Sequence, residues 1–145
     1  MTGIDFHFNV PDKVNYACRL LRKAVVAGGK KVVVTGDAAM LDAVDAALWQ
    51  FSAVEFIGHC RSDSEAHLLA RSPVVIAAPG AGALPHQEVL VNLGETVPVG
   101  FERFERLIEV VTGDEGDRAA SRVRWRHYTE RGYALKPFDV AKGSA

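Results

Sequence analysis

Apolar and polar positions repeat with two different periods along the chain, and the change of period predicts where strands give way to helices. Residues 4–9 alternate strictly between apolar and polar side chains, which is typical of a strand with one face in the core. Over 14–25 the apolar residues recur every three or four positions, which indicates a helix that begins after Asp12 and ends at Gly28. Asp37 can cap a second helix. The positions of that helix expected to face the core are Met40, Leu41, Val44 and Leu48.

Other segments are apolar at consecutive positions, the pattern of strands that are covered on both faces. These segments are 31–35, 73–77, 88–92 and 107–111. The stretch from Gln50 to Arg71 shows no clear period. A last helix is predicted from Asp114 to about Gly132, where an acidic entry and a glycine mark its two ends.

Strands that alternate with helices predict an α/β fold, with a mostly parallel sheet and helices on both faces. A chain of 145 residues has the size of one domain with one core. We therefore assign residues 1–135 to a single Rossmann-like domain and residues 136–145 to a loose C-terminal tail. No heptad repeat or long exposed apolar stripe marks a self-association face, so we expect a monomer when the chain is on its own.

Composition and charge narrow the possible functions. A net charge of −1 argues against a protein that binds nucleic acid through its overall charge. The amino terminus has no signal-peptide pattern, and no apolar run reaches the roughly 18 residues of a membrane span, so we expect a cytoplasmic protein without a membrane partner. Cys18 and Cys60 are the only cysteines, and the pair His59–Cys60 lacks the spacing of a zinc site. We expect no metal.

The fold class raises the hypothesis of a nucleotide site, but its fingerprints are missing. The turn G-x-G-x-x-G should follow the first strand, where the sequence reads VPDKVN, and no Gly-Lys-Ser/Thr triplet occurs. The nearest candidate is the loop from Gly80 to Gly82, in which Pro85 stands at the third glycine position. No hydrolase or metalloprotease motif is present. We expect neither a cofactor nor catalysis; the alternative is a nucleotide-binding enzyme or sensor that uses the Gly80–Gly82 loop.

The last helix carries a stripe of basic and aromatic side chains. At 100° per residue, one face holds Arg118, Arg122, Trp125, Arg126 and Thr129. Guanidinium groups suit carboxylates and phosphates, and an exposed indole supplies apolar contact. The side expected to meet the sheet holds Ala119, Val123 and His127. Two alternatives remain: a solvated basic helix paired with nearby acids and with Trp125 buried, and direct binding of single-stranded DNA with Trp125 stacked on bases.

A second aromatic cluster surrounds the end of the second predicted helix. Trp49 lies at that end, and Phe51 and Phe56 follow in the irregular stretch. These rings either cover one edge of the sheet or form an exposed apolar patch for a partner.

Several segments together resemble the chi subunit family of bacterial DNA polymerase III. These are IDFHFNV, CRLLRKAVVAGGKKVVV, LDAVDAALWQF with EFIGH, VLVNLG, FERFERLIEVV and RVRWRHYTERGY. Their order and spacing resemble the family over essentially the whole chain. The resemblance implies a Rossmann-like fold that binds no nucleotide, and a non-catalytic accessory subunit of the polymerase holoenzyme.

The resemblance also implies two partners. Chi-like proteins join the clamp loader, through the psi subunit, to the acidic C-terminal tail of single-stranded-DNA-binding protein, which ends in an apolar residue with a free carboxylate. The implied tail-binding positions are Arg118, Arg122, Trp125 and Arg126, some of which carry Lys and Tyr in better-known members. Psi, or a helicase-like repair protein in its place, would dock at Trp49 and Phe56. Single-stranded DNA would be contacted only indirectly.

Overall fold

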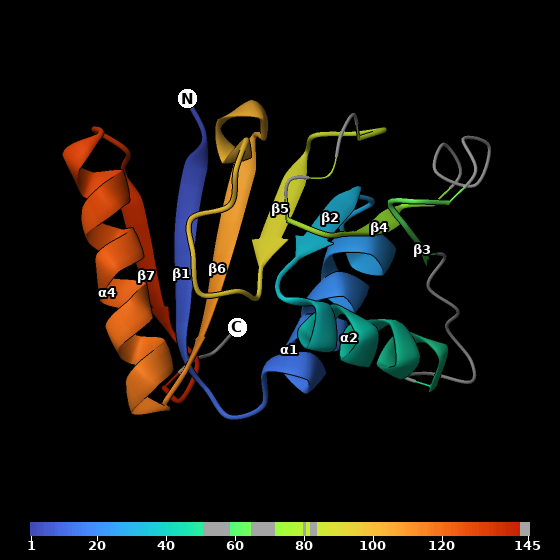
Figure 1. Ribbon diagram of the computed structural model, residues 1–145, viewed down its shortest axis with the longest axis horizontal. Coiled ribbons are helices and arrows are strands. Elements are labelled where there is room, and N and C mark those ends of the chain that lie inside the picture. The colour runs from blue at the N-terminus through green and yellow to red at the C-terminus, as the bar shows by residue number, and fades with distance from the viewer. Residues whose placement is uncertain (51–58, 65–71, 80, 82–83, 143–145) are drawn as a thin grey trace.

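The computed structural model describes residues 1–50, 59–64, 72–79, 81 and 84–142, which build a seven-stranded sheet (Figure 1). The strands are β1 (Gly3–Val10), β2 (Val32–Thr35), β3 (His59–Arg61), β4 (Val74–Ala77), β5 (Val89–Asn92), β6 (Arg106–Thr112) and β7 (Leu135–Asp139). Their order across the sheet is β3-β4-β2-β5-β6-β1-β7. The pairing of these strands is parallel throughout. The α/β fold with a parallel sheet is therefore confirmed.

The described α-helices begin after acidic residues that cap them. They are α1 (Lys13–Arg22), which continues as a π-helical segment (Lys23–Ala27), α2 (Ala38–Gln50) and α4 (Glu115–Glu130); a short 3₁₀ turn (Phe101–Arg103) follows β5. Asp12 accepts a hydrogen bond from the Asn15 amide at 3.0 Å, and Asp37 accepts one from the Met40 amide at 2.8 Å. Each cap satisfies an amide that has no partner within its own helix. None of the described helices has the length and apolar character needed to cross a membrane.

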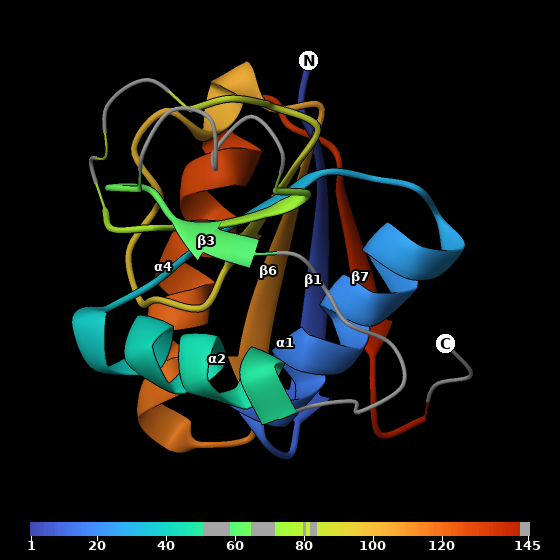
Figure 2. The ribbon, with the colours of Figure 1, turned by 90° about the vertical axis from the view of Figure 1, so that its right-hand side faces the viewer.

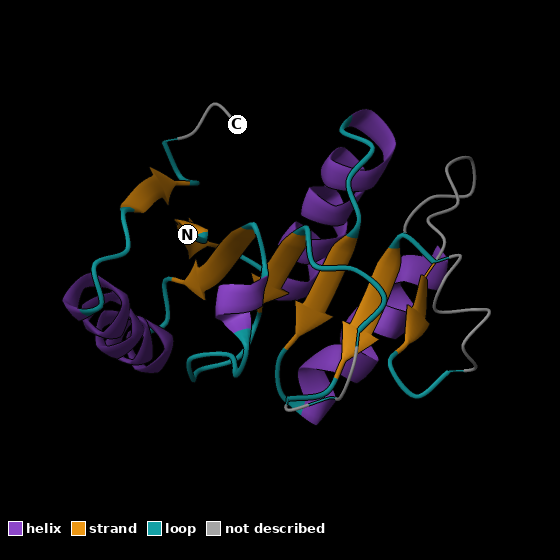
Figure 3. Ribbon diagram, turned by 90° about the horizontal axis from the view of Figure 1, so that it is seen from above, coloured by secondary structure: helices purple, strands orange, loops and turns teal. Residues whose placement is uncertain are grey.

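Helices cover both faces of the sheet, as predicted. Successive residues of β2 alternate between the two faces: Val32 and Val34 pack with α1 and α2, whereas Val33 packs with the 3₁₀ turn and α4. Figure 2 shows α1 and α4 on opposite sides of the strands, and Figure 3 shows the strands as one layer with helices on either side. The short inner strands β2, β4 and β5 are buried at every position, which explains their continuous apolar runs.

Both edge strands differ from the predictions. The sequence predicted a loose tail from Lys136, but β7 pairs with β1 from Leu135 to Asp139, and the Val140 amide donates to Phe8 O at 3.0 Å. The boundary at residue 135 is therefore corrected. At the other edge, β3 lies within the stretch that showed no period. Edge strands are only half covered, so neither segment carries the apolar run that revealed the inner strands.

Candidate functional site

A groove of about 590 Å³ lies between α4 and the edge of the sheet formed by β1 and β7. The sequence-predicted residues Arg118, Arg122, Trp125 and Arg126 all line it. Opposite them lie Phe6 and Phe8 of β1 and Pro137 of β7. One side of the groove is thus basic and the other apolar. We call it the α4 groove.

Trp125 contributes an open aromatic surface to the α4 groove. Its side chain is 37% exposed, whereas Phe6 beneath it is 3% exposed. The two ring centroids are 4.9 Å apart at 62°, an edge-to-face contact that holds the indole in place. Trp125 therefore packs on the core without being buried in it. This differs from the alternative of a solvated helix, which expected a buried Trp125.

The arginines of the α4 groove have few acidic partners. Arg122 lies 3.7 Å from Glu115, and both side chains are largely exposed. Such a surface pair contributes about 0–1 kcal/mol. Arg118 and Arg126 form no ion pair with any residue that the structure describes. Their guanidinium groups are available for a bidentate contact with a carboxylate or phosphate.

The face of α4 that meets the sheet is not the predicted one. The buried residues of α4 are Asp117, Arg124 and Tyr128. Ala119 is exposed and Val123 is 64% exposed, while His127 is only partly covered. The prediction that these three residues meet the sheet is therefore wrong. The reason is a buried carboxylate in β6 that draws polar side chains of α4 inward.

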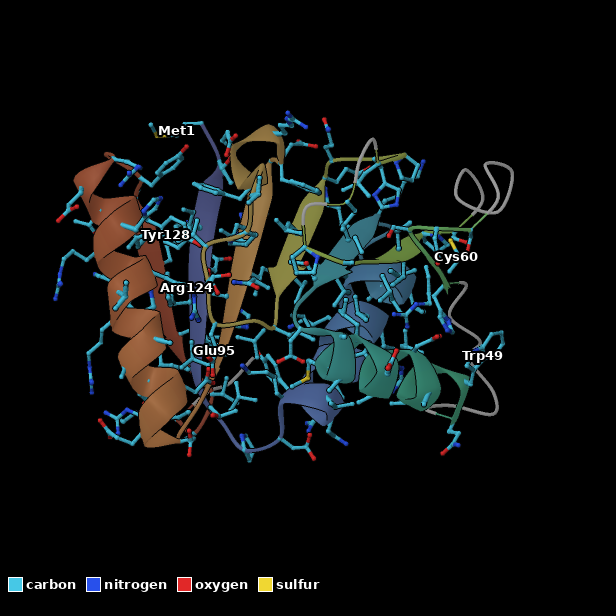
Figure 4. All side chains as sticks on the ribbon, viewed as in Figure 1. Met1, Trp49, Cys60, Glu95, Arg124 and Tyr128 are labelled. Atoms are coloured by element: carbon cyan, nitrogen blue, oxygen red, sulfur yellow. The ribbon has the colours of Figure 1, made fainter. Side chains whose placement is uncertain are left out.

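That carboxylate belongs to Glu109, which is fully buried. It accepts hydrogen bonds from Arg124 Nε at 3.1 Å, Tyr128 OH at 2.5 Å and Asn92 Nδ2 at 2.9 Å. Burial raises the pKa of Glu109, while the Arg124 charge and the bonds from Tyr128 and Asn92 oppose that rise. Arg124 and the Asn92 amide nitrogen can only donate, and Arg124 is positively charged, so these two contacts fit the ionised carboxylate. We call these four residues the Glu109 cluster; Figure 4 shows Arg124 and Tyr128 on the inner side of α4.

The sequence held a signal for the Glu109 cluster. Glu109 stands in the middle of the apolar run LIEVV, and a charge buried in a strand requires a partner. The run identified the strand, but it did not say which residue supplies the partner. Only the fold brings Arg124 to the same place.

The amino-terminal turn of α4 is anchored by contacts of Asp117 that do not involve the Glu109 cluster. Asp117 Oδ2 accepts from the Thr112 amide at 2.8 Å and from Thr112 Oγ1 at 3.0 Å, and Lys13 Nζ lies 3.2 Å from the same oxygen. Burial alone would raise the pKa of Asp117, but the Thr112 amide and the Lys13 ammonium outweigh it and lower the pKa. The start of α4 is thereby fixed to β6 and α1.

The second predicted site lies at the other end of the molecule. Trp49, at the end of α2, is 63% exposed and its ring centroid is 4.8 Å from that of His59 in β3. His59 Nε2 is hydrogen-bonded to Asp45 Oδ1 at 3.0 Å. Figure 4 shows Trp49 at the opposite end of the sheet from α4. Phe56, the other residue of this prediction, lies outside the described residues.

A smaller hollow of about 310 Å³ lies at the carboxyl ends of β2, β4 and β5, where parallel sheets commonly bind nucleotides. Its described lining contains Asp37 and Glu95 and no Lys, Arg or His, a charge pattern that disfavours phosphate. A Cβ on Gly36 would lie 3.4 Å from the Gly94 amide, so the glycines there serve close packing of two loops. Gly80 and Gly82, named in the nucleotide alternative, lie outside the described residues.

Among the described residues, no group of three or more His, Cys, Asp or Glu side chains is arranged to hold a metal ion.

Comparison with known proteins shows similarity to one family. A family model described as "DNA polymerase III chi subunit, HolC" matches residues 1–136. The DNA polymerase III subunit chi of Pseudomonas aeruginosa is 32% identical over 143 residues, which are 94% of this chain and 95% of that protein. Its counterpart from Haemophilus influenzae is 27% identical over 126 residues, which are 86% of this chain and 85% of that protein.

A solved structure shows the same kind of fold. It is the crystal structure of the C-terminal part of the Fun30 ATPase domain, with a TM-score of 0.53 and 13% identity. The likeness covers 76% of this chain and 44% of the Fun30 chain, so this chain spans less than half of that protein's length. At this identity the likeness concerns the fold alone.

Proposed function

Because the chain belongs to the family of DNA polymerase III chi subunits, we propose that it is a non-catalytic adaptor of DNA replication. In this proposal the α4 groove binds the acidic C-terminal tail of single-stranded-DNA-binding protein. The exposed surface around Trp49 docks the psi subunit of the clamp loader, or an equivalent partner.

The observation that carries the proposal is the combination of charge and shape in the α4 groove. Three guanidinium groups and one open indole line a single groove, although the chain as a whole has a net charge of −1. A bulk-charge interaction with nucleic acid does not need an aromatic groove, and an apolar docking site does not need three arginines. A peptide with an acidic segment and an apolar end uses both features.

The groove geometry suggests how such a tail binds. The arginines receive the acidic side chains and the terminal carboxylate, while the last apolar side chain lies against Trp125, Phe6 and Phe8. A second way to bind a peptide would be to pair it as an additional strand with the open edge of β7, and Pro137 disfavours this mode. The Val140 amide bonds toward β1, so by alternation the amide position of Pro137 faces outward, where proline has no N–H to offer. The tail therefore binds through its side chains and its free end.

Calorimetric titration with a short acidic peptide that ends in phenylalanine tests the proposal. We expect micromolar affinity, about −8 kcal/mol, that weakens as salt is added. The same peptide with an amidated end is the control, and its binding should be lost because the terminal carboxylate is gone. Absence of binding to either peptide at low salt would refute the tail-binding proposal.

A charge reversal assigns the binding to the α4 groove. Arg122→Glu should abolish peptide binding and leave the melting temperature unchanged, because Arg122 is 57% exposed and makes only the weak pair with Glu115. Arg19→Glu makes the same charge change on α1, on the other face of the sheet, and should bind normally. Equal binding by the two variants would place the peptide elsewhere.

Titration of the protein with single-stranded DNA, without any partner protein, separates this function from direct DNA binding.

A further inference from the structure

We propose that Arg124 and Glu109 are positioning residues that set the rotation of α4 about its axis, and thereby turn Trp125 and the three arginines toward the groove. The inference rests on the proposed function, because it explains how the peptide-binding face is presented. It assigns a role to a buried ion pair that does not belong to the lining of the α4 groove.

The first argument is that apolar packing alone does not select this rotation, because Tyr128 is the one apolar side chain that it brings from α4 into the core. An amphipathic helix normally turns its apolar stripe to the core. In α4 the residues turned inward are Asp117, Arg124 and Tyr128, while Val123 is 64% exposed. Val123 lies about 100° around the helix from Arg124, on the side away from Trp125. A rotation of about that size would bury Val123 and Ala119, which is the arrangement predicted from the apolar pattern alone.

The second argument is the geometry of the Glu109 cluster. Arg124 Nε reaches one carboxylate oxygen of Glu109 at 3.1 Å, and Tyr128 OH, one turn later, reaches the other at 2.5 Å. Asn92 Nδ2 of β5 fixes the carboxylate from the sheet side at 2.9 Å. Two directional contacts to one carboxylate, spaced one turn apart on α4, constrain both the rotation and the axial position of the helix.

The third argument concerns the guanidinium itself. Arg124 Nη1 donates to Glu95 O at 2.8 Å, so the same side chain also ties α4 to the loop after β5. Arg124 Nη2 has no hydrogen-bond partner among the described residues. An unsatisfied buried donor is unfavourable for stability, and buried ion pairs can often be replaced by apolar side chains without loss of stability. The pair is better explained by the orientation it imposes.

The test replaces the pair by apolar side chains in the full chain, as Glu109→Met with Arg124→Met. A cysteine probe at Val123→Cys, in a Cys60→Ser background, reports the rotation through its rate of reaction with a thiol reagent. With the ion pair present, the probe should react quickly because position 123 is exposed. Without the pair we expect a folded protein in which the probe reacts at least about tenfold more slowly, because position 123 turns toward the sheet.

Peptide binding is the second readout. In the absence of the probe, the double variant should bind the acidic peptide between about twofold and thirtyfold more weakly than the unaltered chain. An unchanged probe rate together with unchanged affinity would overturn the inference. Failure of the unaltered chain to bind the peptide would overturn the proposed function instead, while the probe rate would still decide the rotation.

A milder variant covers the case in which the double variant does not fold. Arg124→Lys keeps the positive charge but cannot donate to Glu109 and Glu95 O with one planar fork. It should weaken peptide binding and slow the cysteine probe in the same direction, though less. Arg131→Lys is the matched control at an exposed position just after α4 and should change neither quantity. Equal results for the two lysine variants would overturn the inference.

Discussion

Asp117 is a single residue whose charge state holds the start of α4. Its carboxylate accepts from the Thr112 amide and pairs with Lys13. Burial would raise the pKa of Asp117, but these contacts outweigh burial and lower the pKa. A carboxyl group with a lowered pKa in the folded state adds stability above its unfolded pKa, and that stability is lost as the pH falls through the folded pKa.

We therefore predict that Asp117→Asn lowers the free energy of unfolding at pH 7 by about 1–3 kcal/mol. The difference from the unaltered chain should begin to shrink below about pH 4, the ordinary pKa of an aspartate, and should be lost as the pH falls through the lowered pKa of folded Asp117, where its carboxyl group also becomes neutral. Urea unfolding at a series of pH values measures it. Asp63→Asn, at an exposed position, is the control and should change stability little at any pH. A difference for Asp117→Asn that stays constant from pH 7 to acid would contradict the role of its charge.

Residues of the α4 groove and of the Glu109 cluster show what a sequence does and does not reveal. Arg118, Arg122, Trp125 and Arg126 could be grouped in advance because helical periodicity alone places them on one face. Which way that face turns depends on Glu109, a residue of a different element. The partner of a buried charge is fixed by the fold and not by local spacing, so the helix was predicted correctly and its orientation was not.

Among the elements, some strands can be predicted from the sequence pattern and others cannot. The inner strands β2, β4 and β5 are covered on both faces and carry short apolar runs rich in β-branched residues, which are typical of buried strands. The edge strand β7 reads LKPFD and is only partly covered, so nothing in it distinguishes a strand from a tail. Its pairing partner β1 lies at the other end of the chain. Long-range pairing of this kind leaves no local pattern.

Removal of β7 should therefore have consequences that removal of a loose tail would not. We compare a chain that ends at Ala134 with one that ends at Lys142. The shorter chain should lose about 2–5 kcal/mol of unfolding free energy, because the edge of β1 loses its backbone partners. It should also bind the acidic peptide more weakly, because Pro137 forms part of the α4 groove. Chemical denaturation and calorimetry measure the two effects, and equal stability of the two chains would restore the interpretation of this segment as a loose tail.

In the whole molecule, the two candidate surfaces lie at opposite edges of one sheet. The α4 groove borders β7, and Trp49 packs on His59 of β3. Six inter-strand steps of about 4.8 Å separate these edges, or roughly 29 Å. The described residues of the two surfaces belong to different helices and different strands. The proposed adaptor function requires this separation, because it has both partners bound at the same time.

Independence of the two surfaces is the last prediction. Trp49→Ala should weaken docking to a clamp loader that contains psi by at least about tenfold, because an exposed indole is a typical anchor of an interface. It should leave peptide affinity unchanged, and Arg122→Glu should do the reverse. In the double variant the two free-energy changes should add to within about 0.5 kcal/mol, as expected for distant sites that share no partner. Surface-plasmon titrations of each variant with each partner give the four affinities. If peptide binding responds to Trp49→Ala, the sheet couples its two edges, and the protein is a switch between partners and not a passive connector.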